Sequence, residues 1–337
     1  MNTIPNVRFG STGLKVSQLA LGTMTFGLQT DEVTSNAILD KAAAGGINFI
    51  DTADVYPLGG TPETAGRTEE IIGKWFRSRG SNLRHDFVLA TKAGGKSGHN
   101  PWDTGLSRKH LLDAIDGSLK RLQVDHVDLY QFHHDDRETP LDECLEAMDT
   151  IVRSGRARYI GVSNLLAYRL ARAIGRTEVN NLVKLVSVQP RYSLLFREIE
   201  RELLPLAMEE GLAVISYNPL AGGLLTGKYR AGSAPEEGTR FSLGTAASMY
   251  QSRYWHDNYF ATVAQIEKLA NEAGVALPTL AVAWTMANPA VTAPLLGASK
   301  PEQLDLTMAA ASYVLSDELK QKLDEITNEY RRGDAPR

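Results

Sequence analysis

The sequence predicts an α/β fold in which eight parallel strands form a (β/α)8, or TIM, barrel behind a short N-terminal β-hairpin. Short apolar runs rich in Val, Ile and Leu alternate with segments of helical periodicity along most of the chain. No break in composition divides the 337 residues, so we expect one domain over residues 1–337. An open, doubly wound sheet is the alternative that the same alternation allows.

The expected elements follow in chain order. The opening segment "VRFGSTGLKVSQLALG" predicts two brief strands around a Ser-Thr-Gly turn. The barrel strands are expected at 19–21, 47–50, 87–91, 127–132, 159–162, 185–188, 213–216 and 292–296. The clearest helices are expected at 32–44, 68–77, 108–122, 141–153, 168–174, 199–209, 258–273 and 279–287.

Local signals refine these boundaries. Ser107 and Thr139 precede helical patterns and are expected to be N-caps. Residues 221–254 are glycine-bearing and predicted to be irregular, and a loop of that length is usually functional.

The composition argues against several classes of protein. A net charge of -4 argues against a nucleic-acid-binding protein. The single cysteine, Cys144, cannot form an intramolecular disulfide and is expected to pack inside a helix. The first residues lack the pattern of a signal peptide, and no apolar run reaches the ~18 residues of a membrane span, so we expect a cytoplasmic protein without a membrane partner. The sequence does not indicate an oligomeric state.

The ends of the predicted strands carry the chemistry. In a parallel barrel the active site lies at the carboxyl ends of the strands. Ionisable groups stand at the second, third and fourth of these ends, amides, hydroxyls and an aromatic ring at the next three. In order, the eight ends are Gly22-Thr23, Asp51, Lys92, His133, Ser163-Asn164, Gln189, Tyr217 and Gly297–Ser299.

An acid–base group can be built from the first cluster and a nearby tyrosine. A free tyrosine has a pKa near ~10, and a neighbouring ammonium lowers it. Lys92 can supply that cation, Asp51 can hold it, and His133 can orient the oxygen that accepts a proton from Tyr56. Alternatively, Asp51 and Lys92 form a structural salt bridge and Tyr56 anchors a loop.

Other sites are weaker. No G-x-G-x-x-G opens the first helix, so the dinucleotide fingerprint of the Rossmann fold is missing. "AGGKSG" imitates a phosphate loop, but Ala90 stands where that motif needs its first glycine. We expect no metal site, since "HHDD" at 133–136 is a weak signal.

Several motifs in order, "INFIDTADVYPLGG", "LATKAGG", "VDLYQFHHDD", "YIGVSN", "VQPRYSLL", "SYNPLAGGLLTGKY" and "LLGASKPEQL", resemble the aldo-keto reductase superfamily. The resemblance runs over residues 7–315 and is to the bacterial branch that also resembles potassium-channel beta subunits. The Asp-Tyr-Lys-His tetrad of the family falls on Asp51, Tyr56, Lys92 and His133.

The resemblance also implies a cofactor, NADP(H), bound in extended form across the barrel mouth. Ser163, Asn164 and Gln189 would hold the carboxamide, and Tyr217 would stack on the nicotinamide ring. Ser299, Lys300 and Gln303 match the 2′-phosphate segment. The other implied contacts are Gly22, Thr23, Met24, Asp51, Asn218, Pro219, Leu220, Gly222, Lys228, Arg240 and Gly297.

One departure concerns the adenine. Related proteins often carry an acidic residue and an asparagine where this chain has Leu306 and Thr307. This difference weakens the preference for NADP over NAD.

The resemblance implies an NADP(H)-dependent reductase of aldehydes or ketones in which Tyr56 protonates the carbonyl oxygen. The alternative is a cofactor-sensing regulatory protein of the channel-beta-subunit type with slow turnover. The resemblance implies a small carbonyl substrate, and the alternatives are sugar-derived aldehydes, aromatic aldehydes and small ketones. Candidate apolar walls of its pocket are Met24, Phe26, Trp102 and Trp255.

Overall fold

The computed structural model describes residues 4–80, 82–235, 237–244 and 246–331. Eight parallel strands follow one another in the order β10-β3-β4-β5-β6-β7-β8-β9. Their bounds are β3 Ala20–Gly22, β4 Phe49–Asp51, β5 Val88–Ala93, β6 Val127–Phe132, β7 Ala157–Ser163, β8 Leu185–Gln189, β9 Ala213–Val214 and β10 Leu295–Gly297.

The two outer strands of this order meet, which distinguishes a barrel from an open sheet. Val214 of β9 forms a parallel bridge with Val291, just before β10. The backbone N–H of Leu295 donates to the carbonyl of Ser216 at 2.8 Å. The (β/α)8 prediction is therefore confirmed, and the doubly wound alternative is wrong.

An antiparallel hairpin, β1 (Asn6–Arg8) with β2 (Lys15–Ser17), precedes the barrel as predicted. Phe9 and Val16 are fully buried and join the cluster of apolar side chains inside the barrel. The ring of Phe9 lies edge-on to that of Phe49, with centroids 5.8 Å apart. Since Phe49 begins β4, the hairpin covers the amino-terminal end of the barrel, opposite the expected site.

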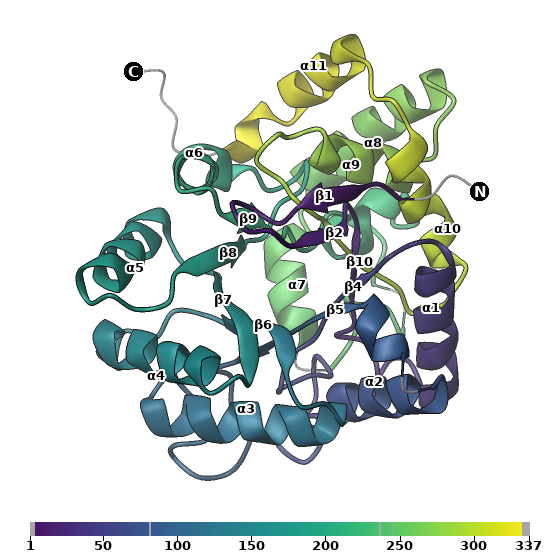
Figure 1. Ribbon diagram of the computed structural model, residues 1–337. Helices are drawn as coiled ribbons and strands as arrows, with labels where there is room; N and C mark the ends of the chain where they lie inside the picture. The colour runs from purple at the N-terminus through teal and green to yellow at the C-terminus, as the bar shows by residue number, and fades with distance from the viewer. Residues whose placement is uncertain (1–3, 81, 236, 245, 332–337) are drawn as a thin grey trace.

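Helices surround the strands (Figure 1). An outer apolar cluster joins the helices to the outward-facing strand residues. Their bounds are α1 Glu32–Ala44, α2 Arg67–Ser78, α3 Arg108–Leu122, α4 Leu141–Arg153, α5 Ala167–Val179, α6 Leu203–Glu209, α7 Ala246–Tyr254, α8 Asp257–Glu272, α9 Leu277–Met286, α10 Gln303–Met308 and α11 Asp317–Ile326. Short 3-10 turns are η1 Leu83–Asp86, η2 Glu198–Glu200, η3 Ala221–Thr226, η4 Ala309–Ser312 and η5 Asn328–Arg331.

Only one of the two predicted N-caps is confirmed. The Ser107 side chain accepts from the His110 N–H at the start of α3. At α4 the N-cap position is Pro140, without a side-chain cap. The Thr139 hydroxyl instead donates to the Asp136 carboxylate at 2.7 Å, because that carboxylate organises the preceding turn.

The segment 221–254 is more regular than predicted. It contains η3 and α7, and its aromatic side chains pack against one another and against Trp255. The rings of Phe241 and Trp255 are 4.8 Å apart, and Phe241 is fully buried. This burial stabilises a segment whose sequence looked like loop, and half-buried Trp255 packs against the same cluster.

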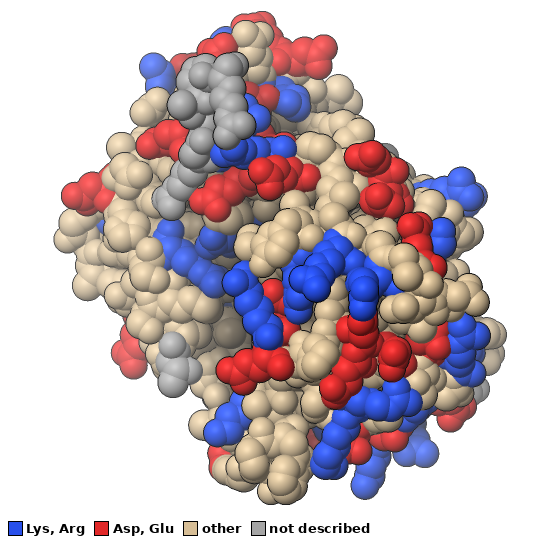
Figure 2. Space-filling view, turned by 90° about the vertical axis from the view of Figure 1, so that its left-hand side faces the viewer, with Lys and Arg blue, Asp and Glu red and all other residues tan. Residues whose placement is uncertain are grey.

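From the sequence we expected Cys144 to pack inside the protein and no segment to span a membrane. Cys144 is buried in α4, where burial raises the pKa of its thiol to about 12, and its packing role is confirmed. Lys and Arg side chains are interspersed with Asp and Glu over the face shown in Figure 2. Among the described helices, none is both long and apolar enough to span a bilayer.

Candidate active site

The alternation of strand side chains brings the predicted residues to one end of the barrel. The interior cluster contains Phe49 of β4, Ala90 of β5 and Leu129 of β6. Two residues further along each strand, on the same inner face, stand Asp51, Lys92 and Gln131. The inner face is thus apolar at the amino end of the strands and polar at the carboxyl end.

Asp51 and Lys92 form a buried ion pair. The Lys92 ammonium lies 2.5 Å from Asp51 Oδ1, and both side chains are at most 2% exposed. The ammonium also donates to the Thr52 carbonyl at 2.8 Å. Burial lowers the pKa of Lys92, but its interactions with Asp51 and Tyr56 outweigh this effect, so the net shift is upward and the lysine stays charged.

The second oxygen of Asp51 is held by two amides. Asp51 Oδ2 accepts from Gln189 Nε2 at 2.9 Å and from Gln131 Nε2 at 3.1 Å. Gln131 was missed from the sequence, although the period of two in β6 places it on the inner face, two residues before His133. Gln189 was expected to hold a carboxamide, and its side-chain N–H is already directed to Asp51.

Tyr56 follows β4 in the loop that leads to α2. The Lys92 ammonium lies 5.1 Å from the centroid of the Tyr56 ring. Burial raises the pKa of Tyr56, and the Lys92 charge opposes this shift without overcoming it. The direction of the lysine effect is as expected, but the net pKa of Tyr56 lies above its ordinary value because the phenol is desolvated.

His133 lies edge-on to Tyr56, with ring centroids 5.6 Å apart. Burial, the Lys92 charge and His134 lower the pKa of His133 to about 3. The imidazole is therefore neutral near pH 7 and suited to donating or accepting a hydrogen bond rather than to supplying a proton. Its Nδ1 is buried and has no hydrogen-bond partner among the described residues.

The four residues expected around a nicotinamide form a network. Asn164 Nδ2 donates to the His133 carbonyl at 2.9 Å, and Asn164 Oδ1 accepts from the Tyr217 hydroxyl at 2.7 Å. The Ser163 hydroxyl donates to the Gln189 carbonyl at 2.8 Å. Both ends of the Asn164 amide are thus engaged, so a ligand contact there would replace one of these bonds.

The neighbouring strand end is also tied to the pair. Thr23 is fully buried, and its hydroxyl donates to the Asp51 carbonyl at 2.9 Å. Its neighbours Gly22 and Met24 are half-buried. Phe26 is fully buried in the outer core, so the expectation that it lines a substrate pocket is wrong.

After β9 the chain turns tightly beside the mouth. Asn218 has a positive φ, and its side chain accepts from the Gly222 N–H at 2.7 Å. A Cβ on Gly222 would lie 2.8 Å from the Tyr250 ring, so this close approach requires glycine. Lys228 and Arg240 form no ion pair with another described residue, and each lies over an aromatic ring, Tyr229 and Tyr250 respectively.

The segment after β10 presents a cation beside a small polar cluster. Lys300 is exposed and forms no ion pair with the residues described. Gln303 Oε1 accepts from the Ser299 N–H at 2.9 Å. Leu306 is 48% exposed, while Thr307 is buried and its hydroxyl donates back to the carbonyls of its own helix. The Thr307 side chain therefore offers no free polar group at this surface.

Asp54 is a second residue that the sequence did not single out. It lies three residues after Asp51, is 1% exposed, and neither of its oxygens has a side-chain partner among the residues described. Burial and the charge of Glu69 raise the pKa of Asp54 well above its ordinary value. We conclude that this carboxyl is neutral over a wider pH range than a surface aspartate.

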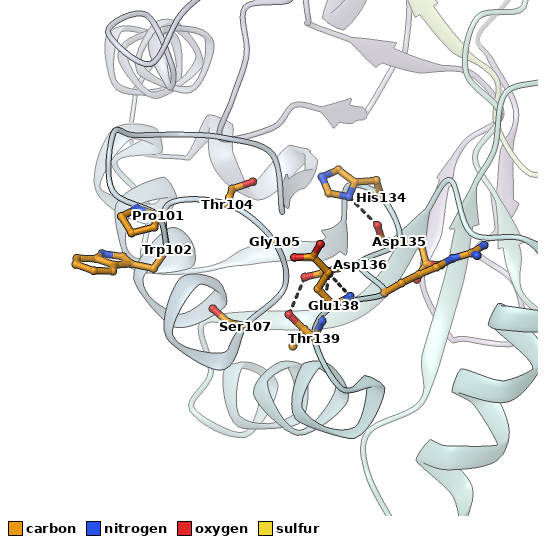
Figure 3. A pocket seen from close by; sticks show the side chains of 11 residues that line it. Pro101, Trp102, Thr104, Gly105, Ser107, His134, Asp135, Asp136, Glu138 and Thr139 are labelled. Atoms are coloured by element: carbon orange, nitrogen blue, oxygen red, sulfur yellow. Dashed lines mark hydrogen bonds and ion pairs between the residues drawn. The ribbon is translucent and has the colours of Figure 1, made fainter.

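A groove of about 700 Å³ adjoins the candidate site between the loops after β5 and β6. His134 and Asp136 line one wall and Trp102 the other (Figure 3). Asp136 already accepts from the Leu106 N–H and from Thr139. The indole of Trp102 points away from His134 (Figure 3) and is 48% exposed. The groove thus offers space beside His134, the residue that follows His133 in the chain.

Metal chemistry has little support from the side chains. Within the ranges that the structure describes, no group of three or more His, Cys, Asp or Glu residues is placed to hold a metal ion.

A barrel with these residues at its carboxyl end matches a known family model. Residues 18–328 match the Aldo/keto reductase family, so the chain belongs to this family. It is 43% identical over 322 residues to "Uncharacterized oxidoreductase YrpG" of Bacillus subtilis, covering 94% of each chain. It is 37% identical over 321 residues to "Probable voltage-gated potassium channel subunit beta" of Oryza sativa, covering 94% of each. It is 30% identical over 342 residues to "Versiconal hemiacetal acetate reductase" of Aspergillus parasiticus, covering 94% of this chain and 95% of that protein.

Proposed function

We propose that this oxidoreductase reduces small aldehydes or ketones to alcohols with NADP(H), and that Tyr56 supplies the proton. The observation that carries the proposal is the buried Asp51–Lys92 ion pair beside Tyr56 and His133. The cofactor supplies a hydride to the carbonyl carbon when bound. The proposal also includes a cytoplasmic location, which rests on the composition of the chain.

The side chains at the mouth suit such a cofactor. The Tyr217 ring offers a flat face, and the hydrogen bonds that join Tyr217 to Asn164, Asn164 to Ser163 and Ser163 to the Gln189 carbonyl place the proposed carboxamide contacts in one network with it. The diphosphate would be held by the turn after β9 and two cations, namely Asn218, Pro219, Leu220 and Gly222 with Lys228 and Arg240. Lys300 and Ser299 would hold a 2′-phosphate, and the lack of an ion-pair partner for Lys300 among described residues leaves its charge available.

The residues of this chain have separate roles in the proposed step. Tyr56 would donate its phenolic proton to the carbonyl oxygen as the carbon receives hydride. Lys92 stabilises the phenolate that remains, and Asp51 keeps the lysine charged and in place. The neutral imidazole of His133 would direct a hydrogen bond to the carbonyl oxygen. The high net pKa of Tyr56 keeps the phenol protonated at neutral pH, as reduction requires.

The test is a steady-state assay of NADPH and NADH oxidation with a panel of aldehydes and ketones. We expect carbonyl-dependent oxidation that is faster, or half-saturated at lower concentration, with NADPH. Absence of both turnover and NADPH binding would overturn the proposal.

A second candidate function follows from the likeness to the Oryza sativa protein, which is named as a probable potassium channel subunit. In that case the chain would bind the cofactor as a signal and turn over slowly. Tight NADPH binding with turnover near the background rate on the whole panel would favour this candidate.

A further inference from the structure

Arg191 lies two residues beyond Gln189, at the carboxyl end of the barrel. β8 ends at Gln189, but its pairing with the next strand continues, because Arg191 and Tyr217 form a parallel bridge. The Tyr217 N–H donates to the Pro190 carbonyl at 2.9 Å. Side chains alternate along a strand, so Arg191 is on the same inner face as Gln189, which contacts Asp51.

Two aromatic rings hold the guanidinium of Arg191. Its Cζ lies 3.5 Å from the centroid of Phe196 and 5.8 Å from that of Tyr254. The Tyr254 hydroxyl accepts from Asn218 Nδ2 at 3.0 Å, which fixes that ring next to the proposed diphosphate segment. A guanidinium that stacks by its face keeps the N–H groups of its edge for another partner.

No counter-ion satisfies this edge. Among described residues, no carboxylate forms an ion pair with Arg191 and no side chain or carbonyl accepts from it. The buried or half-buried Arg84, Arg121 and Arg197 differ in this respect. Their carboxylate partners lie at 2.7, 2.8 and 2.8 Å. Among the described half-buried arginines, Arg240 and Arg253 also lack an ion-pair partner, but Arg191 differs from both because two rings hold its guanidinium.

A second positive charge, that of Arg253, adds to the charge of Arg191 at Tyr217. Arg253 directly precedes Tyr254 in α7 and, within the described part of the chain, has no ion-pair partner. The charges of Arg253 and Arg191 both act on Tyr217, where they oppose the rise in the pKa of its hydroxyl that burial causes. Both charges are therefore felt at the ring expected beside the nicotinamide.

We propose that Arg191, supported by Arg253, forms an oxyanion subsite at the barrel mouth that binds a carboxylate or phosphate of a bound molecule. The guanidinium edge can hold two oxygens of either group at once. The oxyanion has two possible sources, an acidic substituent of the carbonyl substrate or the diphosphate of the cofactor. This inference rests on the proposed function and adds to it a preference for a charged ligand.

The experiment compares Arg191→Gln with Arg158→Gln. Arg158 is exposed at the opposite end of the barrel, as the second residue of β7, and its substitution gives the same change of net charge. Benzaldehyde and its para-carboxylated analogue form the substrate pair, assayed with saturating cofactor. Fluorescence titrations give the Kd of NADPH and NADH, and calorimetry gives the binding of benzoate and inorganic pyrophosphate without turnover.

For Arg191→Gln we expect either the substrate measurements or the cofactor measurements to weaken by about ten- to a hundred-fold, as for the loss of a charge-assisted contact. A substrate source raises the Michaelis constant for the carboxylated aldehyde and weakens benzoate binding, without affecting benzaldehyde. A cofactor source raises the Kd of NADPH and NADH equally and weakens pyrophosphate binding. In either case Arg191→Lys restores part of the loss, and Arg158→Gln changes nothing.

The proposed subsite is wrong if Arg191→Gln changes none of the measurements with the carboxylated aldehyde, the cofactors, benzoate or pyrophosphate. It is also wrong if both aldehydes lose activity equally while every Kd is unchanged, since Arg191 would then only pack. The calorimetry judges the subsite even if the parent reduces no aldehyde. That separate result would count against the proposed function instead.

Discussion

The Lys92 ammonium lies 2.5 Å from the Asp51 carboxylate, with both side chains at most 2% exposed. Two amides occupy the other oxygen of Asp51, so the carboxylate is fully hydrogen-bonded in an environment from which water is excluded. Removing one partner of a buried pair typically costs ~3–5 kcal/mol, because the other charge is left uncompensated. The arrangement therefore fixes a positive charge beside Tyr56 that solvent does not screen.

Replacing Tyr56 by Phe tests the proton donor. We expect Tyr56→Phe to lower kcat for carbonyl reduction by at least ~10²–10⁴-fold, the usual contribution of a general acid. The Kd of NADPH is expected to stay within about twofold, since the ring remains. Rapid-mixing assays and fluorescence titration measure the two quantities. A variant with nearly full activity would contradict the role of the phenol.

The barrel was predictable because its signal repeats along the chain. Eight short apolar runs between amphipathic segments were enough to expect β3 to β10, and α1, α3 and α4 match the predicted bounds. The predicted eighth strand, 292–296, differs most from the structure, where β10 is Leu295–Gly297, and β9 ends two residues before the predicted limit of 216. Here the barrel closes through a single bridge and isolated hydrogen bonds, so the strands are short and their limits depend on tertiary contacts.

The site was predictable only where a residue stands at the end of an apolar run. Asp51 and Lys92 were expected in this way. Gln131 lies inside β6, where one amide among apolar residues attracts no notice. Arg191 acquires meaning only through Phe196 and the distant Tyr254. The raised pKa of Tyr56 was also not expected, because the cost of burying a phenol depends on packing that the sequence does not display.

Asp54 gives a prediction about stability. Its carboxyl is buried without a side-chain partner among the described residues, and its pKa in the folded state is raised. Below the unfolded pKa, near ~3.9, both states are protonated and the carboxyl has no pH-dependent effect. As the pH rises, the unfolded state releases its proton first, so the parent loses stability until the folded pKa is passed.

Asp54→Asn removes this loss. We therefore expect the stability of the variant relative to the parent to increase with pH, by up to ~1.4 kcal/mol per pH unit while the group titrates. Urea unfolding between pH 4.5 and 8 measures the difference. Asp113→Asn is the control, because it makes the same chemical change at an exposed partner of Lys109. A difference for Asp54→Asn that is flat or falls with pH would show that Asp54 is ionised in the native state.

Lys300 gives a prediction about cofactor preference. A charge-assisted contact with a phosphate is worth ~1.5–3 kcal/mol, or roughly ten- to a hundred-fold in affinity. We expect Lys300→Ala to weaken NADPH by this factor and leave NADH unchanged. Titration of both cofactors gives the ratio, with Lys120→Ala as a control on the exposed side of α3. An unchanged ratio would place the 2′-phosphate elsewhere.

The last prediction concerns the pH dependence of the reverse reaction, alcohol oxidation, which requires the phenolate of Tyr56. Burial raises the pKa of Tyr56 and the Lys92 charge lowers it, with a net rise. Oxidation by the parent is therefore expected to increase with pH up to and beyond ~10. Lys92→Met removes the lowering charge, so the pKa moves further up. At a fixed pH below the pKa of Tyr56, the rate is expected to fall about tenfold for each unit of that shift.

A histidine mechanism gives a different profile. The pKa of His133 is about 3, so a rate controlled by that imidazole would not change between pH 7 and 10. Lys92→Met leaves the Asp51 carboxylate buried without its cation, and the variant is therefore measured beside Asp51→Asn/Lys92→Met, which carries neither charge. Circular dichroism confirms that each variant is folded, and single-turnover rates ensure that chemistry is observed. If the rise of oxidation with pH is the same in the parent and in both folded variants, Lys92 does not set the ionisation of Tyr56.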